Sequence, residues 1–210
     1  TYPRYIAGIL KHHEIDYDYF TIDSLRDNIN LWKNISAYDL IIVISGMTVP
    51  GKYVGGSPAT LNEIQKIGEN FSGFKVIGGP IKLGYSLEGK SKAKPVALGD
   101  YDIFCYGDIE AVLDHYLSTG EIDAYKKRDE AFLKYFSILG AEVILKHPNY
   151  PNVIAEIETS RGCERDIFCS YCTEPFYGKV DFRDEEDIIK EVAALYSYGE
   201  RYFRIGRQAN

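Results

Sequence analysis

Three of the four cysteines lie close together in the chain, and this cluster constrains the protein more than any other feature. Five residues separate Cys163 from Cys169, and two separate Cys169 from Cys172. Thiolates at this spacing can hold one soft metal centre, and they select zinc, cuprous copper or iron–sulfur clusters. A structural zinc site takes four protein ligands, whereas Cys105 lies far upstream and no histidine follows His147. Three ligands with an open position favour an iron–sulfur cluster, and zinc with a ligand from elsewhere is the alternative.

The residues around these cysteines resemble the radical S-adenosylmethionine (SAM) family. The resemblance rests on the sequence Ser-Arg-Gly-Cys at 160–163, on Tyr171 between the last two cysteines, and on Phe182-Arg183 followed by three glutamates at 185, 186 and 191. The family usually has three residues between its first two cysteines, whereas this chain has the five residues 164–168.

This resemblance implies a [4Fe–4S] cluster held by the three clustered cysteines, with SAM bound at the fourth iron. In the family, an electron from the cluster cleaves the sulfonium C–S bond and gives a 5′-deoxyadenosyl radical. Tyr171 would then lie against the adenine, and Gly206 and Arg207 would hold the methionine amino group. The electron donor would be a protein such as ferredoxin or flavodoxin. The resemblance assigns no catalytic side chain and no substrate, whether a small molecule or a protein.

The composition fits a globular protein of one large or two small domains. The chain has 210 residues, of which 45% are hydrophobic, and this is enough for a core. Its formal net charge of −7 argues against a general nucleic-acid binder. Four cysteines in a chain of this length are not a disulfide framework, and the sequence shows neither a signal-peptide pattern nor a membrane-spanning apolar run. We therefore expect a soluble, cytoplasmic protein without a membrane partner.

An alternation of strands and helices through residue 118 predicts an open parallel α/β sheet. Periodicity predicts strands at 17–22, 39–45, 74–78 and 101–105, and helices at 3–13, 31–35, 59–70 and 109–117. The β-branched run at 39–45 is typical of a strand that is covered on both faces.

The predicted strands end in small residues, namely Ser45, then Gly78, Gly79 and Pro80, and finally Gly107. Ligands of open α/β sheets bind at the carboxyl ends of the strands, and the backbone of small residues can approach a ligand closely. Strand-to-helix turns also need glycine for purely structural reasons. Pattern alone leaves both interpretations open.

This half resembles the Rossmann-like, cobalamin-binding-type domain that precedes the radical core in one branch of the SAM family. The matching pieces are residues 38–45, 76–80 and 102–110, and the first strand of that domain would lie before Thr1. The motif Asp-x-His-x-x-Gly, which supplies an imidazole to cobalt in other cobalamin proteins, is absent. The resemblance implies cobalamin-dependent methyl transfer or radical rearrangement, or hydrogen abstraction if no cobalamin binds.

The resulting domain prediction has three parts. Residues 1–118 form the cobalamin-binding-type domain, residues 119–150 form a linker with a helix at 123–136, and residues 151–210 begin the radical SAM core. The last part should contain a strand at 153–157, a helix at 185–198 and a strand at 202–205, which are the first units of a βα partial barrel. We expect such a truncated barrel to be inactive alone.

Three alternatives remain at this stage. The cluster could serve electron transfer without SAM cleavage, or the cysteines could hold zinc in a binding domain. A tRNA methylthiotransferase normally carries three more cysteines in its amino-terminal domain, where this chain has only Cys105. We interpret Cys105 as a buried hydrophobe, and His12, His13 and His147 as residues without a ligand role.

Overall fold

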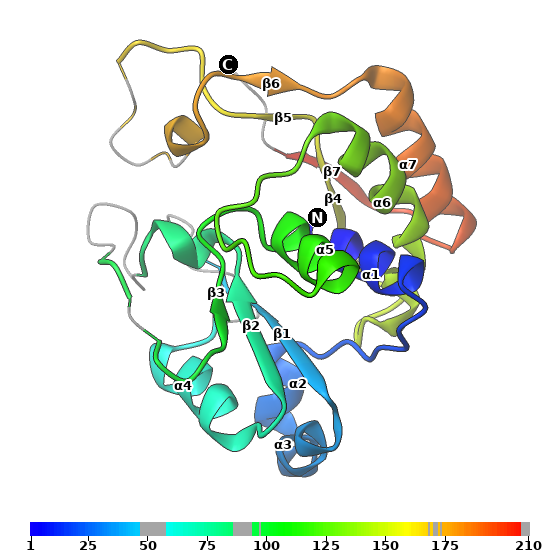
Figure 1. Cartoon of the computed structure of the whole chain (residues 1–210). Coiled ribbons are helices and arrows are strands. Elements are labelled where there is room, and N and C mark those ends of the chain that lie inside the picture. The colour runs from blue at the N-terminus through cyan, green and yellow to red at the C-terminus, as the bar shows by residue number, and fades with distance from the viewer. Residues whose placement is uncertain are drawn as a thin grey trace. The chain divides into compact units, whose positions relative to one another are not determined.

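The computed structural model describes residues 1–46, 58–85, 94–96, 98–167, 169, 172 and 174–206. The chain divides into two compact units (Figure 1). One comprises Phe20–Lys127 and is called the sheet unit below. The other joins Thr1–Tyr19 to Arg128–Asn210 and is called the cysteine-loop unit. This division differs from the predicted one, because residues 1–19 belong with the carboxyl half and no separate linker stands at 119–150.

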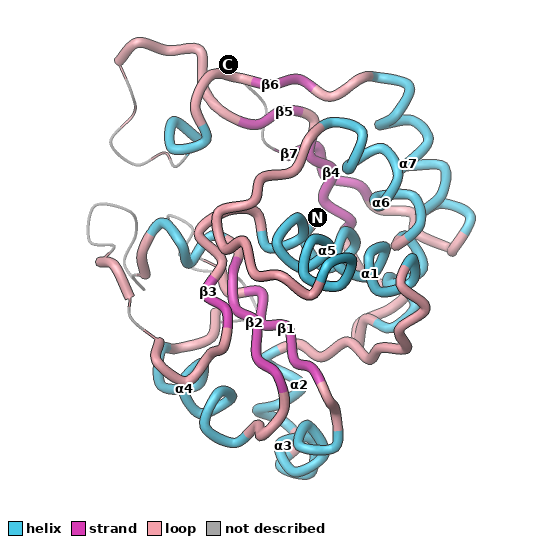
Figure 2. The backbone as a smooth tube through the Cα atoms, viewed as in Figure 1, coloured by secondary structure: helices cyan, strands magenta, loops and turns pink. Residues whose placement is uncertain are grey.

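The sheet unit contains a three-stranded parallel sheet in the order β1–β2–β3 (Figure 2). Strand β1 spans Leu40–Ile44, β2 spans Phe74–Gly78 and β3 spans Ile103–Phe104. Leu40 pairs with Phe74, and Val76 pairs with Ile103. The predicted α/β class with a parallel sheet is therefore confirmed.

Among the described residues of this unit, four α-helices and two 3-10 turns accompany the sheet. They are α2 (Ile22–Asp27), α3 (Ile29–Asn34), η1 (Ile35–Ala37), α4 (Leu61–Asn70), η2 (Pro80–Leu83) and α5 (Ile109–Thr119). The strand predicted at 17–22 is wrong. The Thr21 side chain instead accepts a hydrogen bond from the Ser24 amide at 3.1 Å and caps α2, and this alternative satisfies the backbone locally.

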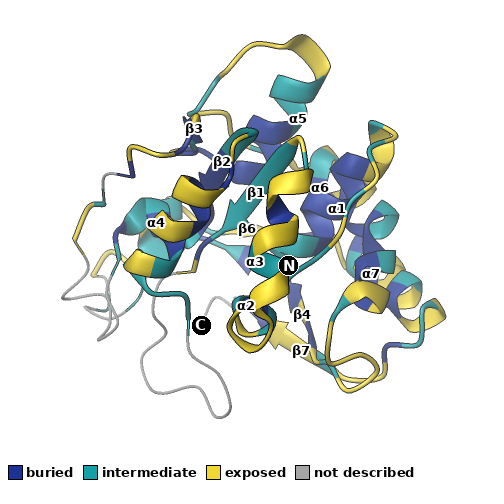
Figure 3. Ribbon diagram, turned by 90° about the horizontal axis from the view of Figure 1, so that it is seen from below, coloured by how far each residue is buried: buried dark blue, intermediate teal, exposed yellow. Residues whose placement is uncertain are grey.

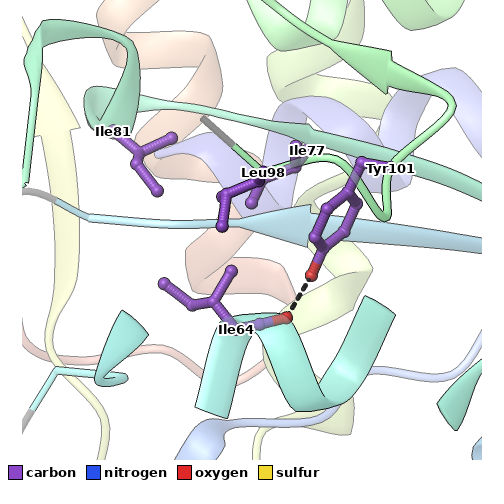
Figure 4. Packing of buried hydrophobic residues seen from close by; sticks show 5 residues of the cluster. All are labelled: Ile64, Ile77, Ile81, Leu98 and Tyr101. Carbon is purple, nitrogen blue, oxygen red and sulfur yellow. Dashed lines mark hydrogen bonds between the residues drawn. The ribbon is translucent and has the colours of Figure 1, made fainter. Parts of the chain in front are cut away.

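Helices cover both faces of the sheet. On one face, Ile77 of β2 packs with Ile64 of α4, and the Tyr101 hydroxyl donates to the Ile64 carbonyl at 2.7 Å (Figure 4). On the other face, the ring of Phe74 stacks on Tyr116 of α5 at 4.8 Å. Side chains of neighbouring residues in a strand point to opposite faces, so α4 and α5 bury opposite sides of β2.

The cysteine-loop unit is built on two parallel strands joined through a helix. Strand β4 (Ala155–Glu158) pairs with β7 (Phe203–Gly206), and α7 (Glu185–Ser197) connects them. Two short strands, β5 (Ser160–Arg161) and β6 (Asp181–Phe182), pair antiparallel. The remaining elements are α1 (Tyr2–His12), α6 (Glu130–Leu139), η4 (Ala141–Lys146) and η5 (Glu174–Tyr177). The described residues of this unit contain no closed barrel.

Helix α1 packs against α6 where Gly8 of α1 approaches the end of α6 and Gly140, the residue after it, approaches α1. A Cβ atom at Gly8 would overlap the Phe136 carbonyl, and one at Gly140 would overlap the Arg4 carbonyl. Helix α6 begins at Glu130 rather than near 123, because the Asp129 carboxylate accepts from the Phe132 amide at 2.8 Å and caps it. The close contact explains why residues 1–19 belong to this unit.

Burial follows this architecture (Figure 3). Strand β1 is half-buried along its length, whereas the last three residues of β2 are buried. In the cysteine-loop unit, Ile157 of β4 and Leu195 of α7 lie in one apolar cluster with Ala141 and Ile144. Among the helices described, none combines the length and the apolar character needed to cross a membrane.

Candidate functional site

The cysteine-bearing loop starts directly beyond the carboxyl end of β4, and its first turn is fixed by the backbone. Gly162 adopts a φ of +94°, and a Cβ atom there would overlap the Lys179 carbonyl. The Gly162 amide donates to a Glu174 carboxylate oxygen at 3.0 Å, and the Cys163 amide donates to the Gly178 carbonyl at 3.0 Å. Only glycine suits position 162, so the turn holds the first cysteine in a defined place.

The three predicted ligands lie on this one loop, as the sequence requires. Cys163, Cys169 and Cys172 are half-buried, and none of the three is joined in a disulfide. The Cys172 amide donates to the Cys169 carbonyl at 3.1 Å, and the Arg165 guanidinium donates to the Cys169 sulfur at 3.4 Å. Within the described ranges, no three His, Cys, Asp or Glu side chains gather into a group that could hold a metal ion. The three thiols thus lie on one segment, but their sulfur atoms do not come together around a common point in this structure.

Two of the predicted cofactor contacts, Tyr171 and Arg207, lie outside the described residues. Gly206 ends β7 and pairs with Glu158, the last residue of β4. The Gly206 carbonyl accepts from the Thr159 amide at 3.4 Å. Gly206 therefore lies at the same strand edge from which the cysteine loop departs.

Beside this edge lies a network of buried charges. The sequence analysis named two of its members, Arg183 and Glu191, only for the family resemblance, and it did not predict their burial or their pairing. The Arg4 Nε donates to Glu191 at 2.6 Å, and Arg183 forms an ion pair with the other oxygen of Glu191 at 2.6 Å. Arg128 pairs with Glu158. All five side chains are at most 6% exposed. Their sequence signal is weak, because most arginines and glutamates lie on surfaces.

The network borders a small cavity of about 40 Å³ next to the loop. Its lining includes Arg128, Arg183 and Glu158 from the network, Ser160 and Arg161 from β5, and Asp129, Glu130, Leu133, Asp181 and Phe182. The Arg161 guanidinium also lies over the ring of Tyr177, with 4.1 Å to its centroid. The cavity is thus polar, and its lining holds three arginines and four acidic residues.

In the sheet unit, two of the predicted strand ends meet at one edge. The Ser45 amide donates to the Gly78 carbonyl at 2.9 Å, and the Ser45 carbonyl accepts from Ile81 at 3.1 Å. Gly79 adopts φ +92° and ψ −157°, a region that is essentially restricted to glycine, and Pro80 begins η2. Backbone hydrogen bonds therefore tie together the carboxyl ends of β1 and β2.

Packing explains the other glycines of this edge. A Cβ atom at Gly78 would lie 2.8 Å from the Cβ of Ile109, and one at Gly107 would overlap the Lys126 carbonyl. The Lys82 ammonium donates to the Gly107 carbonyl at 2.5 Å and to Asp108 at 3.0 Å. These glycines have a structural role whether or not a ligand binds.

Cys105 behaves as predicted for a buried hydrophobe. It has no exposed surface, and burial raises the pKa of its thiol to about 12. His147 is half-buried, with burial lowering its pKa, and its Nδ1 accepts from the Asn149 amide at 3.1 Å. His12 lies in an aromatic group with Tyr135 and Phe136.

Two archaeal proteins are similar to this chain. An uncharacterized protein of Methanocaldococcus jannaschii is 44% identical over 220 residues, which cover 99% of this chain and 40% of that protein. An uncharacterized protein of Archaeoglobus fulgidus is 35% identical over 209 residues, which cover all of this chain and 36% of that protein. The chain thus spans about two fifths of the length of the curated relatives that it matches. No family model and no solved structure matches it.

Proposed function

We propose that the protein is a radical SAM-type enzyme whose cluster is held by Cys163, Cys169 and Cys172. The observation that carries the proposal is the origin of the cysteine loop at the carboxyl end of β4, within a parallel strand–loop–helix–strand unit. Active sites of βα units form at the carboxyl ends of their strands. The donor set fits the group, because three half-buried thiols on one loop are soft ligands free of disulfides.

The residues of the loop have separate tasks in this proposal. The glycine turn at Gly162 positions the first thiol, and Arg165 donates a hydrogen bond to the sulfur of Cys169. Hydrogen bonds to sulfur and solvent exposure tune the potential of an iron–sulfur cluster. A bound cluster supplies the electron that cleaves SAM, while the protein orients the reactants and excludes water.

Anaerobic reconstitution of the full-length protein with iron and sulfide tests the proposal. We expect about four irons per chain, a brown colour, and an electron paramagnetic resonance signal that changes when SAM is added. The Cys169→Ala variant should lose the cluster. The Cys105→Ala variant is the matched control and should keep it, because Cys105 lies in the core of the sheet unit.

Other outcomes would identify the alternatives. A colourless protein with one tightly bound zinc would indicate a zinc-stabilised binding domain. A cluster whose signal is indifferent to SAM would indicate electron transfer.

We propose further that the sheet unit is a Rossmann-like domain of the cobalamin-binding type. The joined carboxyl ends of β1 and β2 support this assignment, because ligands of open parallel sheets bind there. The sequence has no Asp-x-His-x-x-Gly motif, so cobalamin would bind without an imidazole from that motif. After cobalamin is added and the protein is gel-filtered, the protein fraction should retain the visible absorption of cobalamin. If that absorption is lost, the cobalamin assignment is rejected, and the proposal for the cysteine loop is unaffected.

A further inference from the structure

Apart from the sites described so far, the sheet unit has a shallow hollow between α3 and α4. Its volume is about 400 Å³, and it is open to solvent. Its lining comprises Ile29, Trp32, Lys33, Ser36, Lys66 and Asn70. All of these residues except Trp32 are exposed. Small ligands are usually held in clefts that bury most of their surface, so this open hollow fits one side chain of a larger partner better.

Trp32 provides a fixed apolar surface in the hollow. Its indole nitrogen donates to the Leu25 carbonyl at 2.7 Å, and its side chain packs on the buried cluster that includes Ile35 and Ile67. Ile29, which also lines the hollow, is 65% exposed. A single exposed apolar residue is common on protein surfaces. Here, however, a partner's apolar side chain would meet a surface that is already ordered, and this lowers the entropic cost of binding.

The charged side chains of the lining are both positive. They are Lys33 and Lys66, and the described residues add no acid to the lining. Neither ammonium forms an ion pair within the described part of the chain. The Lys66 ammonium lies 4.6 Å from the centroid of the Trp32 ring, as in a cation–π contact. Because an ammonium has three N–H donors, Lys66 can also donate to a carboxylate beside the indole.

The acids of the neighbouring helix do not pair with these lysines. Glu63 of α4 instead accepts from Arg26 at 2.7 and 2.9 Å, and Glu69 is exposed outside the lining. The chain carries a net charge of −7, but at physiological ionic strength exposed charges more than about 8 Å apart are largely screened. A carboxylate in the hollow would therefore interact mainly with Lys33 and Lys66.

We propose that the hollow is a docking site for an acidic protein segment that carries one apolar side chain. The apolar side chain covers the indole of Trp32 and the exposed Ile29. Acidic residues on either side of it pair with the two lysines. Apolar burial supplies most of the affinity, whereas the exposed ion pairs are individually weak and select acidic segments over neutral ones.

Fluorescence anisotropy of labelled short peptides tests the proposal on the full-length protein. The probe is Glu-Glu-Leu-Glu-Glu, and the comparison peptides are Gln-Gln-Leu-Gln-Gln and Glu-Glu-Ser-Glu-Glu. We expect saturable binding of the probe and at least about fivefold weaker binding of each comparison peptide. Equal binding of all the peptides, or no saturable binding of the probe, would overturn the proposal. Displacement of the probe by inorganic phosphate at constant ionic strength would indicate a general anion site and would also overturn it.

Exposed variants locate the docking site. Lys66→Gln should weaken binding of the probe about threefold and leave the neutral peptide unchanged, because only carboxylates pair with this ammonium. Ile29→Ser should weaken both peptides that contain leucine. Lys127→Gln is the control, since Lys127 is exposed and lies outside the lining, and it should bind like wild type. Exposed substitutions of this kind change stability little, so unchanged affinity in Lys66→Gln and Ile29→Ser would contradict the proposal.

Discussion

Glu191 has no exposed surface, yet its carboxylate lies between the guanidinium groups of Arg4 and Arg183. Replacing this carboxylate with a neutral amide would leave two buried arginines that cannot deprotonate. Breaking a buried pair typically costs about 3–5 kcal/mol. We therefore expect Glu191→Gln to lower the free energy of unfolding by about that amount, as measured by urea denaturation at pH 7.

Glu186 on the same helix provides the matched control. It is exposed and lies 3.7 Å from Lys190, and exposed pairs contribute about 0–1 kcal/mol. Glu186→Gln should therefore leave the unfolding midpoint nearly unchanged. If both variants lost the same stability, the buried network would have no special role.

Single residues also show what the sequence could and could not predict about the site. The three cysteines and Cys105 were assigned to different environments from spacing and context, and the structure confirms the buried core position of Cys105. The burial of the arginines was not predicted. Arg4 is buried by a partner, Glu191, that lies more than a hundred residues away in the sequence, and Arg128, which pairs with Glu158, lies in a short segment of ordinary polarity. The glycines at 78 and 107 could not be divided between packing and ligand binding without coordinates.

Helix α4 shows how one element combines local and distant stabilisation. Thr60 and Glu63 form a reciprocal capping box, and Arg26 donates to Glu63 at 2.7 and 2.9 Å. The Arg26 hydrogen bond is the main reason that the pKa of Glu63 falls from 4.5 to about 2. A carboxyl whose pKa is lower in the folded state stabilises the protein above its unfolded pKa. This contribution is lost as the pH falls from about 4.5 towards 2.

The Glu63→Gln variant should therefore be less stable than wild type by about 0.5–1 kcal/mol at pH 7, since the pair is partly exposed. The difference should shrink progressively below pH 4.5 in a series of urea titrations. Glu69→Gln, an exposed change on the same helix, should show no such pH dependence. A deficit that stayed constant down to pH 3 would contradict the assigned role of the Arg26 pair.

Helices and strands with a strong hydrophobic periodicity could be predicted from the sequence, and those without it could not. The strand at 74–78 was predicted with its observed bounds, and the helix at 185–198 was predicted to within one residue. Both have strong periodicity. No strand forms at 17–22, because an alternating pattern gives a segment β propensity but does not provide a neighbouring strand with which it can pair. The short pair β5–β6 was missed because two-residue strands carry almost no periodic signal.

The division of the whole chain was the least predictable feature, because it depends on contacts between distant segments. The sequence of α1 has the pattern of an ordinary amphipathic helix, and nothing in its periodicity indicates that it packs on α6. The glycines at the crossing, Gly8 and Gly140, allow the close approach. In a sequence, however, an isolated glycine in a helical pattern indicates only a less favourable helix and no packing partner. The sheet unit is therefore an insertion in the sequence of the cysteine-loop unit.

This insertion predicts which segments lose protection together when α1 is disturbed. In Gly8→Val, the new side chain would overlap the Phe136 carbonyl of α6, and overpacking of this kind costs about 1–3 kcal/mol. Because proteins open in cooperative units, amide hydrogen exchange should accelerate about tenfold in α6, η4 and α7. Exchange in β1 and β2 should stay unchanged, although these strands are closer to α1 in sequence.

Gly99→Ala is the control, since a Cβ there meets nothing within 4 Å, and it should alter neither unit. Faster exchange in β1 and β2 with α6 unaffected would show that α1 stabilises the sheet unit instead, as the sequence alone had predicted.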